Sequence, residues 1–288
     1  MPCQACAATE WRVAYSGPVR FGKFPNVVAN SVVHACEVCG VRRLAGDPVD
    51  YESDQYRVLV DGDASAEAYY RTHDHILSER LSALGAPTFR DKVVADVGAG
   101  AGSFLDAVKG LALRTIGIEP APHFRTVLEQ RGHAAFSYAS DALPEFAGRV
   151  DVVTTFAVIE HVDDAAGFVR DLAALTKPGG QVIIETPNAR DWLVDFLPAY
   201  AAFFYRVVHR WYFDESCLSR LMIRFGIEPL RTEYRHRYDL SNALCWLRDQ
   251  RPTGTARFTG MAGLDVAYRH ELESSGRSDH FYIVGTKR

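Results

Sequence analysis

Short apolar runs and amphipathic stretches alternate along most of the chain. The run Val93–Val97 is nearly continuous in apolar residues, which is typical of a parallel strand covered on both faces. Strands are expected over residues 93–97, 115–118, 133–137, 151–156, 181–185, 228–234 and 281–286, and helices over 65–84, 104–108, 121–131, 164–175, 218–225 and 240–250. This alternation predicts an α/β fold with a doubly wound, mostly parallel seven-stranded sheet.

Breakers refine the limits of these elements. Ser65 or Asp63 is expected to cap the first helix, and Gly85 to end it. The run 177–180, Lys-Pro-Gly-Gly, is expected to separate a helix from the fifth strand. Residues 251–279 contain many Gly, Ser, Thr and Arg and are expected to form loops. The last strand, reached from the sixth through a short helix over 240–250, is expected to be the antiparallel edge strand.

A glycine-spaced turn follows the first strand of this sheet. Gly98, Gly100 and Gly102 allow a sharp turn and a close approach of a ligand to the main chain. Glu119 ends the next strand, where a carboxylate can accept hydrogen bonds from both hydroxyls of a ribose. The alternative is an ordinary strand–helix–strand crossover with a solvated glutamate. Dinucleotide enzymes need their third glycine where Ser103 stands, so the spacing speaks against them.

The motif Asp96-x-Gly-x-Gly-x-Gly with its acidic second strand resembles the class I S-adenosylmethionine-dependent methyltransferases, which have a Rossmann-like fold. The resemblance covers residues 64–288. It implies that the glycine turn meets the methionine part of the cofactor, that Glu119 binds the ribose and that Asp141 holds the adenine amine. Further cofactor contacts are expected from Tyr69, His73 and Phe156, although the first two residues are as well explained by packing or by exposure to solvent.

Composition sets limits on partners and location. Hydrophobic residues make up 48% of the 288 residues and the net charge is −4, so neither nucleic acid nor an anionic membrane is an expected partner. No apolar run approaches the roughly 20 residues that span a bilayer, and no leader is recognisable at the start. A cytoplasmic, reducing location is expected, where cysteines are thiols or metal ligands.

Four of the six cysteines form two Cys-x-x-Cys knuckles, Cys3 with Cys6 and Cys36 with Cys39. This spacing predicts a structural zinc ion held by four thiolates. Coincidental knuckles or a redox pair are the alternatives, but a thioredoxin-like context is absent. Residues 1–63 carry six basic and eight acidic side chains, so a zinc-ribbon flap and linker is favoured over an RNA reader.

Two later segments extend the resemblance. Glu160-His161-Val162 resembles the corresponding segment of many small-molecule methyltransferases, and His209-x-x-Tyr-Phe resembles zinc-containing sugar C-methyltransferases. Val208 stands where that family has a glutamate, and the chain after Phe213 is shorter. We therefore expect transfer to oxygen instead of carbon. The aromatic insertion 189–213 is expected either to roof an acceptor pocket or to pack as a helical hairpin.

The expected reaction is methyl transfer to a small-molecule or sugar hydroxyl, with His161 or His209 as the general base. A merely packing histidine is the alternative. Ten arginines against six acids in residues 206–257 suggest an anionic acceptor, such as a nucleotide-linked, phosphorylated or glycan-attached sugar, unless they form a solvated face. An RNA methyltransferase and a non-catalytic zinc scaffold remain open, as do the acceptor and the oligomeric state.

Overall fold

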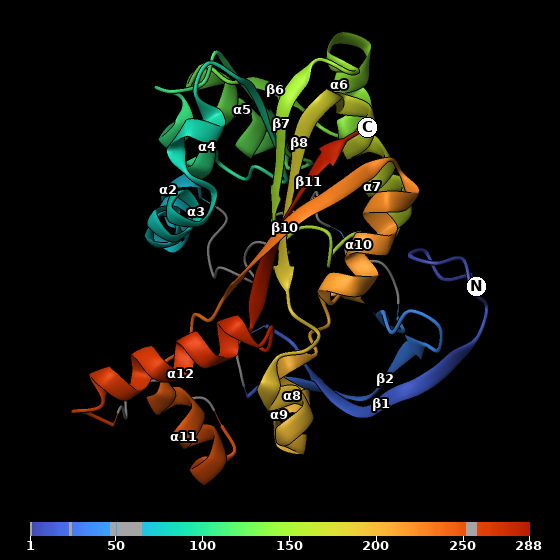
Figure 1. The fold of residues 1–288 in the computed structure, drawn as a ribbon, viewed down its shortest axis with the longest axis vertical. Helices are drawn as coiled ribbons and strands as arrows, with labels where there is room; N and C mark the ends of the chain where they lie inside the picture. The colour runs from blue at the N-terminus through green and yellow to red at the C-terminus, as the bar shows by residue number, and fades with distance from the viewer. Residues whose placement is uncertain (1, 23–24, 47–49, 51–64, 252–257) are drawn as a thin grey trace.

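The computed structural model describes residues 2–22, 25–46, 50, 65–251 and 258–288, and is built around one large sheet (Figure 1). Its strands are β4 (Val93–Val97), β5 (Arg114–Ile118), β6 (Ala134–Phe136), β7 (Val150–Phe156), β8 (Thr176–Pro187), β10 (Ile227–Arg235) and β11 (His280–Lys287). They lie in the order β10-β11-β8-β7-β4-β5-β6, with parallel pairing from β8 to β6. The predicted doubly wound, mostly parallel fold is confirmed.

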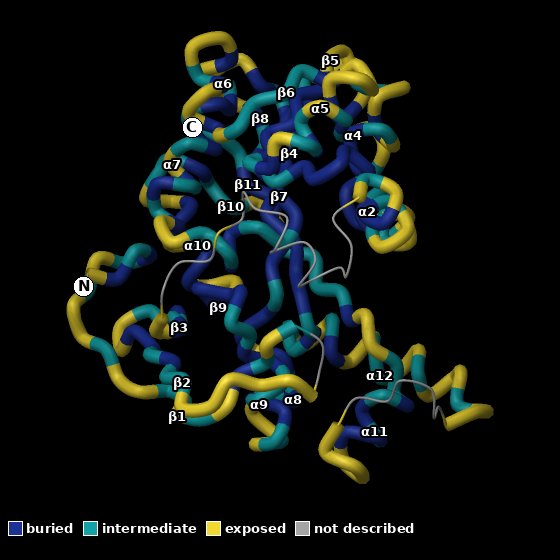
Figure 2. The backbone as a smooth tube through the Cα atoms, turned by 180° about the vertical axis from the view of Figure 1, so that it is seen from behind, coloured by how far each residue is buried: buried dark blue, intermediate teal, exposed yellow. Residues whose placement is uncertain are grey.

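Helices cover both faces of this sheet (Figure 1). They are α2 (Ala66–His73), α3 (Leu77–Leu84), α4 (Ser103–Val108), α5 (Pro122–Gln130), α6 (Ala139–Phe146), α7 (Ala165–Leu175) and α10 (Glu215–Arg224), with short 3₁₀ turns at Asp74–Ile76 and Ala86–Phe89. Side chains of β4 alternate between the two cores. Val94 packs with Phe104 of α4, whereas Ala95 and Val97 belong to the core that includes α6, α7 and α10. Figure 2 shows this sheet as the buried centre of the molecule.

The start and end of the first helical segment follow the expected signals. Ser65 caps α2, and its hydroxyl accepts a hydrogen bond from the N–H of Ala68 at 3.2 Å. Gly85 ends α3 with a φ of 80°, a left-handed value that glycine adopts without strain. The alternative cap, Asp63, lies outside the described residues. Within the described ranges, no helix combines the length and the hydropathy needed to cross a bilayer.

Three expectations about the second half of the chain are wrong. The run 177–180 does not separate α7 from the fifth strand, because β8 already begins at Thr176. Val150 pairs with Thr176 and Val152 with Gln181, so the Lys-Pro-Gly-Gly residues form a bulge inside the strand. The last strand, β11, is antiparallel as expected, but it lies between β10 and β8, and β10 is the edge.

The third error concerns residues 251–279, which were expected to form loops. A helix, α12 (Ala262–Ser274), occupies half of this segment and lies against α11 (Leu240–Asp249) at one end of the molecule (Figure 1). The composition of this segment predicted loops wrongly because most of α12 is exposed, with Leu272 as its one buried residue. A helix with so narrow a buried face lacks the apolar periodicity on which the prediction depends.

The N-terminal residues form a second, antiparallel sheet. Its strands are β1 (Trp11–Arg20), β2 (Val27–Cys36), β3 (Arg42–Leu44) and β9 (Trp211–Tyr212), in that order. The fourth strand comes from the aromatic insertion, so the N-terminal segment completes its sheet with residues from the middle of the chain. The division at residue 63 stays a prediction, because residues 51–64 lie outside the described part of the chain.

The aromatic insertion packs, as one of its two interpretations predicts. It forms α8 (Trp192–Phe196) and α9 (Pro198–Phe204), and α9 lies against β1. Tyr200, Phe204 and Tyr205 share a buried cluster with Val19, Val33 and Leu44 of the N-terminal sheet and with Trp246 of α11. This cluster fixes the position of residues 205–213, which connect the two sheets.

Candidate active site

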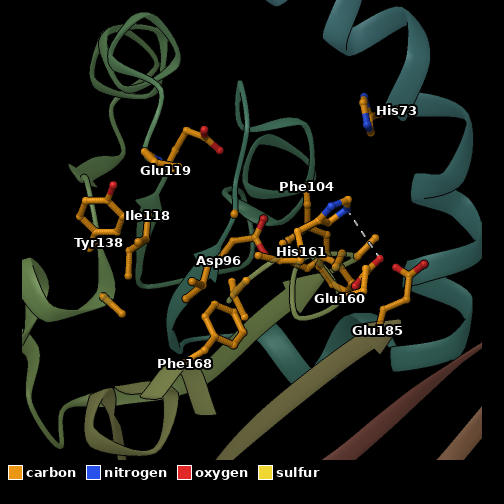
Figure 3. A pocket seen from close by; sticks show the side chains of 18 of the residues that line it. His73, Asp96, Phe104, Ile118, Glu119, Tyr138, Glu160, His161, Phe168 and Glu185 are labelled. Atoms are coloured by element: carbon orange, nitrogen blue, oxygen red, sulfur yellow. Dashed lines mark ion pairs between the residues drawn. The ribbon is translucent and has the colours of Figure 1, made fainter. Parts of the chain in front are cut away.

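A cavity of about 640 Å³ lies at the carboxyl ends of the parallel strands, where open α/β sheets bind ligands. Its volume is in the range of small-molecule sites. One end is lined by the glycine turn and Glu119, and the other by Glu160, His161 and His209. Figure 3 shows these two ends, with Glu119 well separated from the pair Glu160 and His161.

The glycine turn leaves no room for side chains. Gly98 has a φ of 82°, and a Cβ atom there would lie 2.2 Å from a methyl carbon of Val158. Gly100 has a φ of 54°, and a Cβ atom would lie 2.2 Å from the ring of Tyr69. Both positions therefore need glycine for backbone conformation and for space. Gly102 ends the turn as the residue before α4.

Glu119 is buried and its carboxylate faces the glycine turn. Oε2 accepts a hydrogen bond from the N–H of Gly100 at 2.9 Å, and Oε1 accepts one from the N–H of Ala121 at 3.0 Å. Each carboxylate oxygen has further lone pairs. The side chain can thus stay anchored to the backbone while it accepts hydrogen bonds from a ligand's hydroxyls.

Four further expected cofactor residues line the cavity. Tyr69 and His73 stack with ring centroids 3.9 Å apart, and Phe156 and Asp96 lie deeper. Asp96 accepts a hydrogen bond from the hydroxyl of Thr154 at 2.7 Å. Burial raises the pKa of Asp96 to about 6, since the charged carboxylate is poorly solvated there.

The structure does not bring Asp141 into the cavity. Its carboxylate accepts a hydrogen bond from the N–H of Tyr138 at 3.1 Å, which caps the start of α6. The residues around it, Ser137 to Ser140, do line the cavity. An acidic residue in the first turn of a helix satisfies free backbone N–H groups, and this role explains its position in the sequence.

The two candidate histidines meet at the other end of the cavity. Their rings are perpendicular, with centroids 4.7 Å apart. Nδ1 of His161 lies 2.7 Å from the carbonyl oxygen of Val208 and therefore carries a proton, because a carbonyl only accepts. In the neutral ring this leaves a lone pair on Nε2, which lies 3.9 Å from Oε1 of Glu160.

Burial shifts the pKa values of two side chains at this end of the cavity. The pKa of His209 is lowered well below its ordinary value by burial and by the nearby charge of Arg206, so His209 is neutral at pH 7. Burial raises the pKa of Glu160 to about 8. Nε2 of His209 lies 3.4 Å from the guanidinium of Arg206.

Several cavity residues carried no expected role. Glu160 stood in a recognised motif without an assigned function, and Arg206 was one of ten arginines. Glu185, at the end of β8, is buried between Arg80 and Arg237, whose charges outweigh burial and lower its pKa to about 2. Its position at a strand end was the available signal, whereas nothing in the sequence indicated Arg80.

The four knuckle cysteines come together as expected. The Sγ atoms of Cys3 and Cys39 are 3.5 Å apart, those of Cys6 and Cys36 are 3.6 Å apart, and all four lie within 4.8 Å of one another. A tetrahedral zinc site with bonds of about 2.3 Å places its sulfurs roughly 3.8 Å apart. The donor set and its spacing therefore fit zinc.

The thiol cluster is attached to the large domain. The side chain of Gln4 bonds to the carbonyl of Asp163 and to the N–H of Ala166, at the start of α7. Arg224 of α10 donates to the carbonyl of Gln4 at 2.8 Å. The knuckles thus pack on the same face of the large sheet as α7 and α10.

Comparison with known proteins identifies the family. Residues 69–232, more than half of the chain, match the model of a family described as a methyltransferase domain. The chain belongs to this family. Its glycine turn, Glu119 and the group of Glu160, His161 and His209 all lie within the matched residues.

Curated relatives match over a shorter part. A ubiquinone biosynthesis O-methyltransferase of a Bradyrhizobium species is 30% identical over 102 residues, which are 34% of this chain and 40% of that protein. The enzyme of the same name from Methylocella silvestris is 38% identical over 103 residues, which are 33% of this chain and 40% of that one. The chain thus spans about 40% of the length of these relatives.

Solved structures share the fold. A chain from the complex of the Haloferax volcanii Trm112 methyltransferase activator with a methyltransferase has a TM-score of 0.57 at 15% identity, covering 83% of this chain and 98% of that chain. An S-adenosylmethionine-dependent methyltransferase from Archaeoglobus fulgidus has a TM-score of 0.54 at 18% identity, covering 77% and 97%. The predicted class I methyltransferase fold is confirmed.

Proposed function

We propose that the chain transfers a methyl group from S-adenosylmethionine to a hydroxyl oxygen of a small molecule. The observation that carries this proposal is one cavity with a glycine turn and a buried glutamate at one end, and a glutamate with two histidines at the other. The family match and the O-methyltransferase names of the curated relatives support it.

The residues at the first end fit the cofactor. Gly98 lines the cavity, and the lack of a side chain there lets a ligand approach the main chain closely. Glu119 would bind the ribose hydroxyls, and the stacked rings of Tyr69 and His73 would cover the methionine end. The bound cofactor supplies an electrophilic methyl group, so the protein's task is to align the acceptor and to exclude water.

The second end would receive the acceptor. In its neutral form His161 presents Nε2 without a proton, and its Nδ1–H bond to Val208 holds the ring in place. Burial lowers the pKa of its neighbour His209, so His209 is neutral at pH 7. We propose that the hydroxyl proton leaves at this group of residues, with His161 as the better placed of the two histidines.

An anionic acceptor is the finer proposal. Of the arginines in residues 206–257, the described cavity lining includes Arg206 and Arg237. Arg237 is paired with Glu185, whereas Arg206 lies next to His209 and forms no ion pair among the described residues. Its charge would favour a phosphorylated or nucleotide-linked sugar. An intermediate of ubiquinone biosynthesis is the second candidate, because of the relatives' names.

We also propose that Cys3, Cys6, Cys36 and Cys39 hold one structural zinc ion. The close approach of all four sulfurs supports this assignment. The ion would hold the start of β1 and the end of β2 on the large domain, because one cysteine pair precedes β1 and the other ends β2.

The test of the cofactor assignment is calorimetric titration with S-adenosylmethionine. Glu119→Ala should weaken binding by about 1–3 kcal/mol, the usual cost of losing hydrogen bonds to a charged group. Glu129→Ala, on the exposed side of α5, is the matched control and should leave affinity unchanged. If both variants bind the cofactor with equal affinity, Glu119 does not bind the ribose. If the wild type does not bind S-adenosylmethionine at all, a non-catalytic scaffold is favoured.

The acceptor is then sought with radiolabelled cofactor. The panel contains phosphorylated and nucleotide-linked sugars, glycans, ubiquinone-biosynthesis intermediates and RNA. Label transferred to a small-molecule hydroxyl supports the proposal, whereas transfer to RNA alone would overturn it.

A further inference from the structure

Two buried polar atoms at the acceptor end have no hydrogen-bond partner among the described residues. They are Oε1 of Glu160 and Nδ1 of His209, and both side chains are almost completely buried, with 1% and 4% of their residue surface exposed. Buried polar groups are nearly always paired, because leaving one unpaired is costly. Two such atoms in one cavity call for a shared ligand.

His161 completes this group. One donor atom each from Glu160, His161 and His209 lies within 4.8 Å of the others, and the shortest recorded approach is 3.9 Å between Glu160 and His161. Metal bonds of about 2.0–2.1 Å place ligand atoms roughly 3.3 Å apart in a tetrahedral site. Small side-chain rotations therefore suffice for one cation to contact all three residues.

Other contacts already orient these side chains. The Nδ1–H of His161 donates to the carbonyl of Val208, which is the usual outer contact of a metal-bound histidine. Oε2 of Glu160 accepts from the hydroxyl of Thr186 at 3.1 Å. The backbone carbonyl of Glu160 accepts the N–H groups of Arg210 and Trp211 at 2.6 and 3.0 Å, which ties the segment of Glu160 to that of His209.

We propose that Glu160, His161 and His209 bind a divalent first-row transition cation that receives the acceptor's oxygen. Two imidazoles and one carboxylate are the ligand set of catalytic Zn²⁺ and of non-haem Fe²⁺ sites, which keep positions open for a substrate. The inference rests on the proposed methyl transfer, since it assigns the cation to the acceptor end of that cavity. This site is separate from the four thiols.

The cation would replace a free histidine as the group that activates the hydroxyl. A hydroxyl bound to the cation has a lowered pKa and loses its proton to water. The oxygen lone pair then forms the bond to the methyl carbon, while the bond from that carbon to sulfur breaks and sulfur keeps its electron pair. The products are the methyl ether, S-adenosylhomocysteine and one proton.

Arg206 defines which acceptors suit such a site. Its guanidinium lies next to His209 and would repel a cation that carries no anion. An acceptor with an anionic group beside its hydroxyl would lie between the cation and Arg206 and would bind both. The site therefore favours an ionised hydroxyl, or a hydroxyl adjacent to a carboxylate or phosphate.

Cobalt titration tests the inference on the full chain. Protein is first loaded with one equivalent of Zn²⁺ for the thiols and then titrated with Co²⁺, with the visible absorption of bound Co²⁺ as the signal. The wild type should bind one further equivalent without sulfur-to-cobalt charge-transfer bands. Glu160→Gln and His161→Gln should each weaken this binding by at least 10-fold, because each removes a ligand.

The matched control is His73→Gln, which removes an imidazole from the same cavity but not from the cluster. It should keep the second equivalent. Titration with S-adenosylmethionine shows that the cavity is folded in the Glu160 and His161 variants, and circular dichroism shows it for His73→Gln. His161→Gln serves if Glu160→Gln does not fold. A wild type that binds no cobalt beyond the zinc equivalent, or a Glu160→Gln variant that binds it equally, overturns the inference.

The metal site and the proposed methyl transfer can be disproved separately. If cobalt does not bind while cofactor binding and hydroxyl methylation persist in chelator, the inference is wrong and the proposed function stands. If S-adenosylmethionine does not bind, the proposed function fails whatever the cobalt titration shows.

Discussion

The two ends of the cavity are built in different ways. The end with the glycine turn is built on neighbouring strands, β4 and β5, and Gly98 and Glu119 are 21 positions apart. The opposite end combines Glu160, which follows β7, with His209, which follows the aromatic insertion. The first end is a local structure of the chain, and the second is a product of tertiary packing.

The two buried glutamates show what this difference means. Glu119 accepts backbone hydrogen bonds from Ala121, two positions on, and from Gly100 in the turn after the neighbouring strand β4. One oxygen of Glu160 bonds to Thr186, and the other has no hydrogen-bond partner among the described residues and lies 3.9 Å from Nε2 of His161. A locally satisfied carboxylate stays in place as long as its own loop is folded. Glu160 depends on the packing of the insertion against the N-terminal sheet.

The largest expected effect is loss of the thiol cluster. Cys3→Ser should lower the free energy of unfolding by several kcal/mol, because structural zinc contributes about 10–16 kcal/mol to the folding of small zinc domains. Urea unfolding with and without chelator measures the change. Cofactor affinity should change by less than about 10-fold, because the glycine turn does not contact the knuckles.

Cys245→Ala is the control for the loss of a buried thiol outside the cluster and should cost about 1 kcal/mol. If Cys3→Ser is no more destabilising than this control, the thiols hold no ion that matters to the fold.

Trp211→Ala should separate the two ends of the cavity. Trp211 is 1% exposed and pairs with Arg43 in the N-terminal sheet. Truncating a buried aromatic residue costs about 3–5 kcal/mol. The variant should raise the acceptor's KM while cofactor affinity is kept. Phe104→Ala, in the core beside the glycine turn, has a similar cost and should do the opposite. Equal effects of both variants on both ligands would contradict the comparison.

Asp96→Asn should stabilise the protein at neutral pH. The pKa of Asp96 is about 6 in the fold, above its ordinary value near 3.9, so the folded state favours the protonated form. Below pH 3.9 the burial has no electrostatic cost. The native state loses about 3 kcal/mol relative to a neutral side chain as the pH rises through 6.

The Asn variant can still accept the hydrogen bond from Thr154 and lacks this loss. Urea unfolding at pH 4.5, 6 and 7.5 should show the advantage of Asp96→Asn increasing with pH. Asp91→Asn, on an exposed turn before β4, is the control for the substitution itself. A constant difference across the three pH values would mean that folding does not raise the pKa of Asp96.

The smallest expected effect comes from Gly100→Ala. A left-handed conformation costs a residue with a side chain about 1–2 kcal/mol, and the added carbon would displace the ring of Tyr69. Thermal unfolding should detect the loss, and cofactor affinity should fall because the stack of Tyr69 on His73 is disturbed. Gly110→Ala, where a Cβ atom meets nothing within 4 Å, should be close to neutral.

The sequence was sufficient for the local end of the cavity and for the thiols. The sequence placed the glycines and Glu119 at neighbouring strand ends and brought the four cysteines together, while the ligands that they bind stay proposals. The alternation of strands and helices gave the fold, although β11 was expected at the edge of the sheet. Strand order between antiparallel neighbours depends on long-range packing, which periodicity does not report.

The acceptor end could be predicted only in pieces. His161 and His209 were both candidate bases, but they are 48 positions apart in the sequence. The sequence alone does not indicate that their rings meet or that Glu160 lies beside both of them. Asp141 stays a prediction, because its carboxylate caps a helix here while its neighbours line the cavity. The aromatic side chains of residues 189–213 pack in the core. Hydrophobicity alone does not distinguish such core residues from residues that bind a ligand.

The pairing of β3 with β9 has a consequence for folding during synthesis. Arg43 pairs with Trp211, so this sheet closes a loop of roughly 170 residues. At translation rates of about 5–20 residues per second, the first three strands would wait on the order of 10–30 seconds for the fourth. During that time the edge of β3 is unpaired, and exposed strand edges promote aggregation. Early capture of zinc by the knuckles would hold β1 to β3 together until β9 arrives, and would give the metal a kinetic role in addition to a structural one.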